Sequence, residues 1–307
     1  FQMPLTGSDP QGSPLIFSVV SITSSNLTSV IAPGSNRSLW LNVSGVDATN
    51  GPFTGDLVLQ LYEDLVPLTT ARIIELAESG FYDGLTFHRV IQNFMCQGGD
   101  PLGTGGGGTG VKFDDEFVAS LTFNGFGQLA MANSGDDSND SQFFITDADL
   151  SLAGPSPPSH LNFNHTIFGQ VTSGFDVLTK IIETQVDAND KPLTPVLINS
   201  ATVFTNTGGA VLRLSAAAGF TGSADVTVSV VNTNNQTDTQ LIQVMVVPDI
   251  ILDLGGYEEL QVTETRIGIL FQDGSSVGVY ATQLPWEVNG IAGSASAMLR
   301  VPMTTLE

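Results

Sequence analysis

The stretch 81–100, FYDGLTFHRVIQNFMCQGGD, constrains the fold of this chain more than any other. Its middle part, FHRV, is typical of a half-buried strand, from which Arg89 and His88 leave opposite faces because successive side chains alternate. Phe94 and Met95 follow, and then a glycine turn lets the backbone pass close to a bound molecule. A fixed cation, a side-chain amide and two large apolar side chains predict a small apolar pocket with a few placed polar groups.

The segment FHRVIQNFMCQGGD resembles the signature of the cyclophilins, a family of peptidyl-prolyl cis/trans isomerases. Six blocks in one order, over roughly half of the chain, are a strong signal. The resemblance implies a closed β-barrel with two helices and prolyl isomerase activity. The five further blocks that match the family are Gly55–Pro67 (GDLVLQLYEDLVP), Lys112–Phe117 (KFDDEF), Leu129–Ser134 (LAMANS), Ser141–Thr146 (SQFFIT) and His165–Val171 (HTIFGQV).

The chain is long enough for more than one domain, and its hydrophobic content of 41% supplies a sizeable core. We predict a mostly β fold in which a closed eight-stranded, cyclophilin-like barrel with two helices occupies residues 37–206. Residues 1–36 and 207–250 are predicted to hold the early and late strands of a β-sandwich. Residues 251–307 are predicted to be a β-rich tail, in which we identify no family.

Two flanking segments, GSDPQGSPLIF and GFTGSADVTVSVVN, resemble the early and late strands of cadherin-like or immunoglobulin-like repeats. Half a sandwich would expose sheet edges and an apolar face, which is unfavourable. We therefore expect the barrel to be inserted into one sandwich or to pack tightly against its halves. The strands expected outside the barrel are 14–21, 27–32, 210–215, 224–231 and 240–247, with 260–262, 268–271, 276–280 and 297–301 in the tail, where Asp273-Gly274 is an expected hairpin turn.

Within the barrel, Thr69 and Thr70 are candidate caps of the first helix. The glycine run 103–110 lacks the Lys-Ser/Thr pair and the following apolar helix of a phosphate-binding loop, so it is interpreted as an ordinary loop. The elements expected in the barrel are strands 38–44, 55–62 and 198–204 and helices 67–78 and 174–184.

Rotation about an X–Pro bond has a barrier of about 18–20 kcal/mol because the amide is conjugated. Its catalysis needs no nucleophile, metal or acid–base pair, but a donor that favours a pyramidal prolyl nitrogen in a site shielded from water. The resemblance implies that Arg89 is this donor, with Gln97 holding the moving carbonyl or supporting Arg89. With Phe94 these are the expected catalytic residues, and the expected substrate-binding residues are Met95, Asn133, Gln142, Phe144, Leu161, His165 and His160.

Two histidines differ in what they suggest. His88 is expected to be structural because it points away from the pocket if Arg89 points in. His160 stands where many eukaryotic cyclophilins carry a tryptophan. Loss of the indole donor and its area predicts weaker binding of cyclosporin-type ligands without loss of isomerisation.

The expected partners are proline-containing peptides or proteins. The formal net charge of −22 repels nucleic acid phosphates and anionic lipid, and no run of 18 apolar residues predicts a membrane span. No cofactor or metal is expected, since the three histidines do not share one element. Calcium at the polar loop 136–140 is a minor alternative, because the loop lacks the length and terminal Glu of an EF-hand. The single cysteine, Cys96, is interpreted as a small buried hydrophobe.

The chain starts at Phe1 without a leader, so we expect a processed product or a piece of a longer polypeptide, extracellular or at a cell surface, as in bacterial-type secreted proteins. A second hypothesis is a structural, adhesive or filament-forming surface protein that uses the barrel as a binding or building module. Self-association through the sandwich or the tail would fit that hypothesis.

Overall fold

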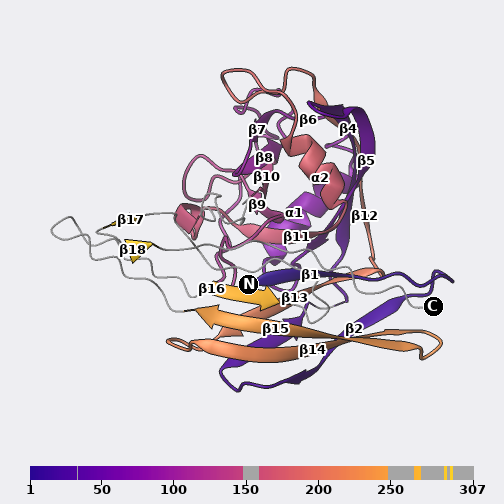
Figure 1. Ribbon diagram of the computed structural model, residues 1–307. Coiled ribbons are helices and arrows are strands. Elements are labelled where there is room, and N and C mark those ends of the chain that lie inside the picture. The colour runs from indigo at the N-terminus through magenta and orange to yellow at the C-terminus, as the bar shows by residue number, and fades with distance from the viewer. Residues whose placement is uncertain (33, 148–158, 248–265, 271–286, 289–290, 293–307) are drawn as a thin grey trace.

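The computed structural model describes two packed regions of β-structure, seen one above the other in Figure 1. The upper region is a barrel with two helices, and the lower one is built from strands that come from both ends of the described chain. The residues that the structure describes are 1–32, 34–147, 159–247, 266–270, 287–288 and 291–292.

The barrel is a nine-stranded sheet with the order β6-β12-β4-β5-β11-β9-β10-β8-β7. The expectation was eight strands, and the difference arises at His88, which separates β6 from β7. An isolated bridge between Thr86 and Asp100 brings the end of the sheet back onto β6 and nearly closes the barrel. The strands are β4 (Ser38–Asp47), β5 (Gly51–Leu61), β6 (Thr86–Phe87), β7 (Arg89–Ile91), β8 (Met95–Gly98), β9 (Gln128–Met131), β10 (Phe143–Thr146), β11 (Ile167–Ser173) and β12 (Val196–Phe204).

Two helices and one short 3₁₀ turn accompany the barrel: α1 (Pro67–Glu78), α2 (Phe175–Ile182) and η1 (Ser159–Leu161). α2 begins after Gly174, whose φ of +84° favours glycine, and a Cβ there would lie 1.9 Å from the carbonyl oxygen of Asp56. The predicted helix boundaries therefore differ from the observed ones by at most two residues.

The cap of α1 is the one helical feature that was predicted wrongly. Thr69 and Thr70 lie inside the helix and are buried, while the N-cap position is Val66, which offers no side-chain acceptor. The amides of Leu68 and Thr69 instead donate to the carboxylate of Glu116, at 3.1 and 2.6 Å. A carboxylate is favourable here because it meets both free amides and the positive end of the helix dipole.

The second region consists of two antiparallel sheets around a core of its own. One sheet has the order β1-β13-β3 and the other β16-β15-β14-β2, so strands before the barrel pair with strands after it. These strands are β1 (Gln2–Thr6), β2 (Leu15–Ile22), β3 (Leu27–Ile31), β13 (Gly209–Ala216), β14 (Gly222–Asn232), β15 (Thr237–Val247) and β16 (Arg266–Leu270).

β1 was not expected, and it carries Pro4 in its middle, although proline is rare in central strands. The strand lies at the edge of its sheet and pairs only with β13, where a proline is tolerated. In the tail, β16 overlaps the expected strand 268–271, and a short pair, β17 (Glu287–Val288) and β18 (Ile291–Ala292), was not expected. The turn and strands expected at 260–262, 273–274, 276–280 and 297–301 lie outside the described residues.

Polar and apolar contacts join the two regions, among them a buried hydrogen bond of 2.7 Å from Gln128 Nε2 to Gln2 Oε1. Arg213 on β13 donates to both carboxylate oxygens of Asp64, at 2.7 and 3.1 Å, and lies 4.5 Å from the ring centroid of Tyr62. Its neighbour Val211 is part of the barrel core although it belongs to β13. The second region is therefore packed onto the barrel beside the end of β5.

Candidate active site

The site is built on a lateral row of residues across four strands of the barrel. Arg89 on β7 lies opposite Gln97 on β8, which lies opposite Phe144 on β10, which lies opposite Ala130 on β9. Residues that are directly opposite in neighbouring strands project from the same face of a sheet. Three predicted site residues from two separate blocks of sequence therefore share one face.

Two further predicted residues lie on this face, because each is two positions along the chain from a member of the row. Met95 precedes Gln97 by two residues and Gln142 precedes Phe144 by two, so both side chains alternate onto this side. Met95 and Phe144 are only 2% and 4% exposed and form the apolar floor. The Phe144 ring stacks on Phe123, with ring centroids 5.7 Å apart.

A chain of amide contacts links this face to the glycine loop 103–110. Gln97 Nε2 donates to Gln142 Oε1 at 2.8 Å, and Gln142 Nε2 donates to the carbonyl oxygens of Gly105 and Gly107 at 3.0 and 2.7 Å. With two carbonyl acceptors on its nitrogen, the amide of Gln142 has one consistent orientation. The oxygen that receives Gln97 is thereby fixed.

Asp100 holds the other side of the glycine loop. Its carboxylate accepts the amides of Leu102, Thr104 and Gly105 at 2.7, 2.9 and 2.6 Å. Burial by itself would raise the pKa of Asp100, but these backbone donors outweigh burial and lower the pKa below its ordinary 3.8. The loop is therefore fastened to the barrel by an ionised side chain at neutral pH.

Arg89 lies at the edge of the row, where its side chain is 44% exposed. Its Nε is 3.5 Å from Oδ2 of Asp190, and the amide of Val90 donates to the carbonyl oxygen of Asp190 at 2.8 Å. Since both partners are half exposed, solvent screens this ion pair and its contribution to stability is small. The contact uses Nε, so the two terminal NH₂ groups carry the remaining donors of the guanidinium.

Phe94 and His160 form the rim of the site. Their rings are stacked, with centroids 6.1 Å apart and an interplanar angle of 26°. Leu161, the next residue after His160, is half-buried and packs against the barrel core. The three residues predicted for this part of the site are thus next to one another, although His160 comes from η1 and Phe94 from the turn before β8.

His165 and Asn133 lie on the side of β9. His165 Nδ1 is 2.9 Å from the carbonyl oxygen of Met131, and its ring meets the Phe144 ring edge-to-face at 5.5 Å. Burial lowers the pKa of His165 below its ordinary 6.5, so the ring is neutral at pH 7. Asn133 Nδ2 donates to the carbonyl oxygen of Asn164 at 2.7 Å, so this amide also organises the site's own backbone.

The face opposite the row carries the side chains that were expected to be structural. His88 is 6% exposed and Cys96 is fully buried. Burial lowers the pKa of His88 and raises the pKa of the Cys96 thiol, so both groups are uncharged at neutral pH. The alternation seen in the sequence therefore separates these side chains from Arg89.

Sequence reasoning missed several groups that shape the site, namely Asp190, Phe123 and the carbonyl oxygens of Gly105 and Gly107. No local pattern marks them, since each reaches the site by a turn whose path depends on the folded barrel. Asp190 gives one weak signal, because Asp and Asn are the side chains that tolerate a positive φ, here +63°.

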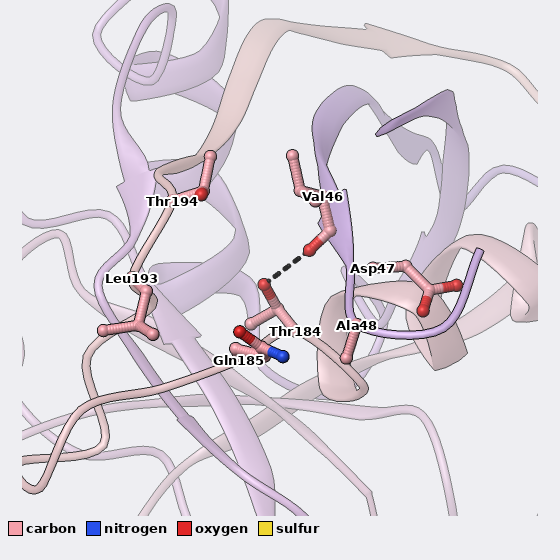
Figure 2. A pocket seen from close by; sticks show the side chains of 7 residues that line it. All are labelled: Val46, Asp47, Ala48, Thr184, Gln185, Leu193 and Thr194. Atoms are coloured by element: carbon pink, nitrogen blue, oxygen red, sulfur yellow. Dashed lines mark hydrogen bonds between the residues drawn. The ribbon is translucent and has the colours of Figure 1, made fainter. Parts of the chain in front are cut away.

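A separate hollow of about 130 Å³ lies away from this row, where α2 ends beside β4 (Figure 2). There Thr184 Oγ1 donates to the carbonyl oxygen of Val46 at 2.8 Å, and the Asp47 carboxylate accepts donors from Thr49 and Asn50. The side chains of Thr184 and Asp47 are thus already paired within the protein. The lining residues are Val46, Asp47, Ala48, Thr184, Gln185, Leu193 and Thr194.

Neither a metal-ligand cluster nor a membrane helix occurs in the part of the chain that the structure describes. No three His, Cys, Asp or Glu side chains of the described residues are placed to hold one metal ion. No described helix is long and apolar enough to cross a bilayer.

Comparison with known proteins identifies the family. The family model for "Cyclophilin type peptidyl-prolyl cis-trans isomerase/CLD" matches residues 46–203. Peptidyl-prolyl cis-trans isomerase CYP18-1 of Arabidopsis thaliana is 46% identical over 155 residues, which are 50% of this chain and 92% of the relative. The probable peptidyl-prolyl cis-trans isomerase A of Mycobacterium leprae is 45% identical over 184 residues, covering 54% of this chain and 95% of the relative.

A solved cyclophilin-type isomerase of Cryptosporidium parvum is similar at 32% identity and a TM-score of 0.45, covering 54% of this chain and 99% of that one.

The fold and the candidate site define a β-barrel protein with one face that combines one arginine, two glutamine amides and an apolar floor. The family model covers more than half of the sequence, so the chain belongs to the cyclophilin-type peptidyl-prolyl cis-trans isomerases. The enzyme class expected from the sequence is confirmed. The matches concern the barrel, and the likeness of the flanking strands to cadherin-like and immunoglobulin-like repeats stays a prediction.

Proposed function

We propose that this chain isomerises X–Pro bonds on the face formed by β7, β8, β10 and β9, with Arg89 as the group that stabilises the twisted prolyl amide. The observation that carries the proposal is the register that places Arg89, Gln97 and Phe144 in one row. A permanent cation, an amide and an aromatic floor then face the same bound segment.

The proposed role of Arg89 follows from the electronic change during rotation. Twisting the amide ends its conjugation, and the prolyl nitrogen becomes pyramidal with a localised lone pair. A guanidinium N–H directed at that lone pair binds the twisted state better than the planar one, which is the requirement for catalysis. The guanidinium of Arg89 presents several donors in a fixed plane.

The amides and the apolar floor complete the proposed mechanism. Met95 and Phe144 hold the proline ring by apolar contact and exclude water below it. Gln97, oriented by Gln142, either holds the carbonyl group of the rotating bond or steadies Arg89. Phe94 and His160 border the site, and Asn133, Leu161 and His165 bind the flanking backbone or line the pocket. The proposed substrates are extended, proline-containing peptides or protein segments.

Replacement of Arg89 tests this proposal. For Arg89→Ala we expect kcat/KM on a short X–Pro peptide to fall by roughly 100-fold or more, since one donor to the transition state is lost. Arg89→Lys should recover little, because a point charge does not reproduce the planar fork. Arg37→Ala is the matched control, as its side chain has a similar exposure of 39% and is paired with Glu63 elsewhere. A folded Arg89→Ala variant with undiminished kcat/KM would contradict the role of Arg89.

A further inference from the structure

Two exposed phenylalanines form a pair beside the site that the isomerase mechanism does not use. The side chains of Phe117 and Phe163 are 42% and 50% exposed, and their rings meet edge-to-face with centroids 6.3 Å apart and an interplanar angle of 89°. Phe163 stands between Leu161 and His165 in the sequence, and both of these belong to the predicted site. The pair therefore continues the site outward.

The backbone of Phe163 is held in an unfavourable conformation. Its φ is +55°, in the left-handed region that bulky side chains rarely adopt. The other non-glycine residues with positive φ among the described residues are Asn or Asp, which tolerate it, namely Asn93, Asp137, Asp190 and Asn235. A glycine would occupy this position without strain. An aromatic ring that is kept here against its backbone preference, with half of its surface in water, points to a role in binding.

The strain is maintained because the residues on both sides of Phe163 are fixed. The amide of Phe123 donates to Asn162 Oδ1 at 2.7 Å, and Asn133 Nδ2 donates to the carbonyl oxygen of Asn164 at 2.7 Å. The hydrogen bond between Asn133 and Asn164 also connects this turn directly to the predicted substrate-binding residues. The position of the ring is thus set by the barrel and not by the exposed turn alone.

Phe117 is presented by a second fixed element. Glu116, the residue before it, donates its amide to Thr166 Oγ1 at 3.0 Å, and its carboxylate caps α1 through the amides of Leu68 and Thr69. Two separate loops therefore bring two aromatic rings together at one place. Exposed aromatic side chains on rigid supports lose little conformational freedom on binding, which is typical of residues that dominate recognition.

We infer that Phe117 and Phe163 form an outer subsite that binds an apolar or aromatic side chain of the substrate a few residues from its proline. This inference rests on the proposed function, because it places the substrate on the face that contains Arg89. An extended chain advances about 3.3–3.6 Å per residue. Phe163 is two positions from both Leu161 and His165, so we place the contacting side chain within three residues of the proline, the range that the peptide series covers.

The test compares peptides that differ at one position only. A series of short Ala-rich X–Pro peptides carries Leu or Phe at each position up to three residues before or after the X–Pro pair. For the unaltered chain we expect kcat/KM to exceed that of the all-Ala peptide by roughly tenfold, on one side of the proline only. The gain should appear in KM, since a contact remote from the rotating bond is made equally before and during rotation.

In Phe163→Gly and Phe117→Ala the preference, which is kcat/KM for the Leu or Phe peptide divided by kcat/KM for the all-Ala peptide, should fall close to one. Phe204→Ala is the matched control, because it removes a 38% exposed phenylalanine from β12, and it should keep both the preference and the activity. Phe163→Gly should also leave the unfolding midpoint unchanged or raise it, since glycine accepts the positive φ. A lower midpoint with an unchanged preference would show that the ring is only structural.

The outcomes separate this inference from the proposed function. If the unaltered chain turns over the all-Ala peptide but shows no preference at any position, or if Phe163→Gly keeps the preference, the outer subsite is overturned and the isomerase proposal stands. If the all-Ala peptide is not turned over, the isomerase proposal fails. Calorimetry then measures the affinity of the Leu or Phe peptide relative to that of the all-Ala peptide without turnover. This ratio still decides whether the two phenylalanines bind an apolar side chain.

Discussion

The barrel and the second region are both β-structures with continuous cores, but the residues that fill them differ. The largest fully buried side chains of the barrel include Tyr82, Phe87 and Phe143, whose rings meet edge-to-face at 5.6 and 6.1 Å. The second core is mostly aliphatic, with Val226, Val228 and similar residues alternating along paired strands. A closed barrel has a wide interior that large rings fill, while Met95 and Phe144 on the face of the row form the floor of the candidate site. Two packed sheets interlock with aliphatic side chains and offer scaffolding.

The comparison is tested most strongly by opening a cavity in each core. Phe143→Ala should lower the free energy of unfolding by about 3–5 kcal/mol, because a ring packed against Tyr82 and Phe87 is lost. Val228→Ala should lower it by about 2 kcal/mol, as two methyl groups leave a fully buried site. We expect isomerase activity to be lost in the first variant and kept in the second, measured by denaturant unfolding and kcat/KM. A folded Val228→Ala variant without activity would show that the second region also takes part in catalysis.

The contact between the two regions should have the next largest effect. Arg213 is 13% exposed, pairs with both oxygens of Asp64 and covers the ring of Tyr62. Arg213→Ala leaves the Asp64 carboxylate three-quarters buried without its cation and should cost about 2 kcal/mol. Hydrogen exchange should then rise in β13 more than in β11. Equal protection in the variant and the unaltered chain would mean that the other contacts, including Val211 and the hydrogen bond from Gln128 to Gln2, suffice to join the regions.

A smaller effect, confined to the barrel, is expected at the cap of α1. Glu116→Ala removes the acceptor of two helix amides and should lower the free energy of unfolding by about 1 kcal/mol. Glu116→Gln keeps one oxygen acceptor without the charge, so its loss should be roughly half as large. Both are measured by thermal and denaturant unfolding. If Glu116→Gln lowered the free energy of unfolding as much as Glu116→Ala, the effect would come from the charge and not from hydrogen bonding.

The smallest effect expected in the barrel is a dependence on pH at its histidines, since the three histidines of the chain all lie in it. The second region has a pH-sensitive group of its own, because burial lowers the pKa of the Phe1 amino group to about 5. Burial lowers the pKa of His88 and His165 in the folded state, so below about pH 6.5 the unfolded chain binds more protons than the folded one. Stability should therefore fall as the pH drops from 6.5 towards the folded-state pKa values and then level off. Unfolding midpoints at pH 7.5 and 5.5 measure this, and His88→Gln with His165→Gln should remove the barrel's part of the difference and leave the part that the Phe1 amino group contributes. A double variant with the same pH dependence would assign it to other groups.

The sequence anticipated the parts of this structure that depend on local periodicity. The alternation FHRV placed Arg89 and His88 on opposite faces, and the strands of β14 and β15 follow from valine-rich alternation between turns. The residues of the site were predicted through the resemblance to a family. They come together only through the register of four strands, and no single segment of sequence shows that register.

The features that escaped prediction are tertiary. The cap of α1 comes from Glu116, well beyond the helix, so the nearby Thr69 and Thr70 were the misleading local candidates. β1 was hidden by Pro4, which is acceptable only because that strand proves to be an edge. Asp190 lies beside β7 although it is about a hundred residues further along the chain, and the strain at Phe163 appears only when the backbone is known.

The central claim is that X–Pro bonds are bound and rotated on the row of Arg89, Gln97 and Phe144. The most direct measurement is an NMR titration of the full chain with a short Ala–Pro peptide, following cis/trans exchange of the peptide and the amide signals of the protein together. The account predicts accelerated exchange with the largest shifts at β7, β8, β9 and β10 and little change in β14 and β15. Accelerated exchange with shifts centred on the second region, or no exchange with the barrel folded, would contradict it.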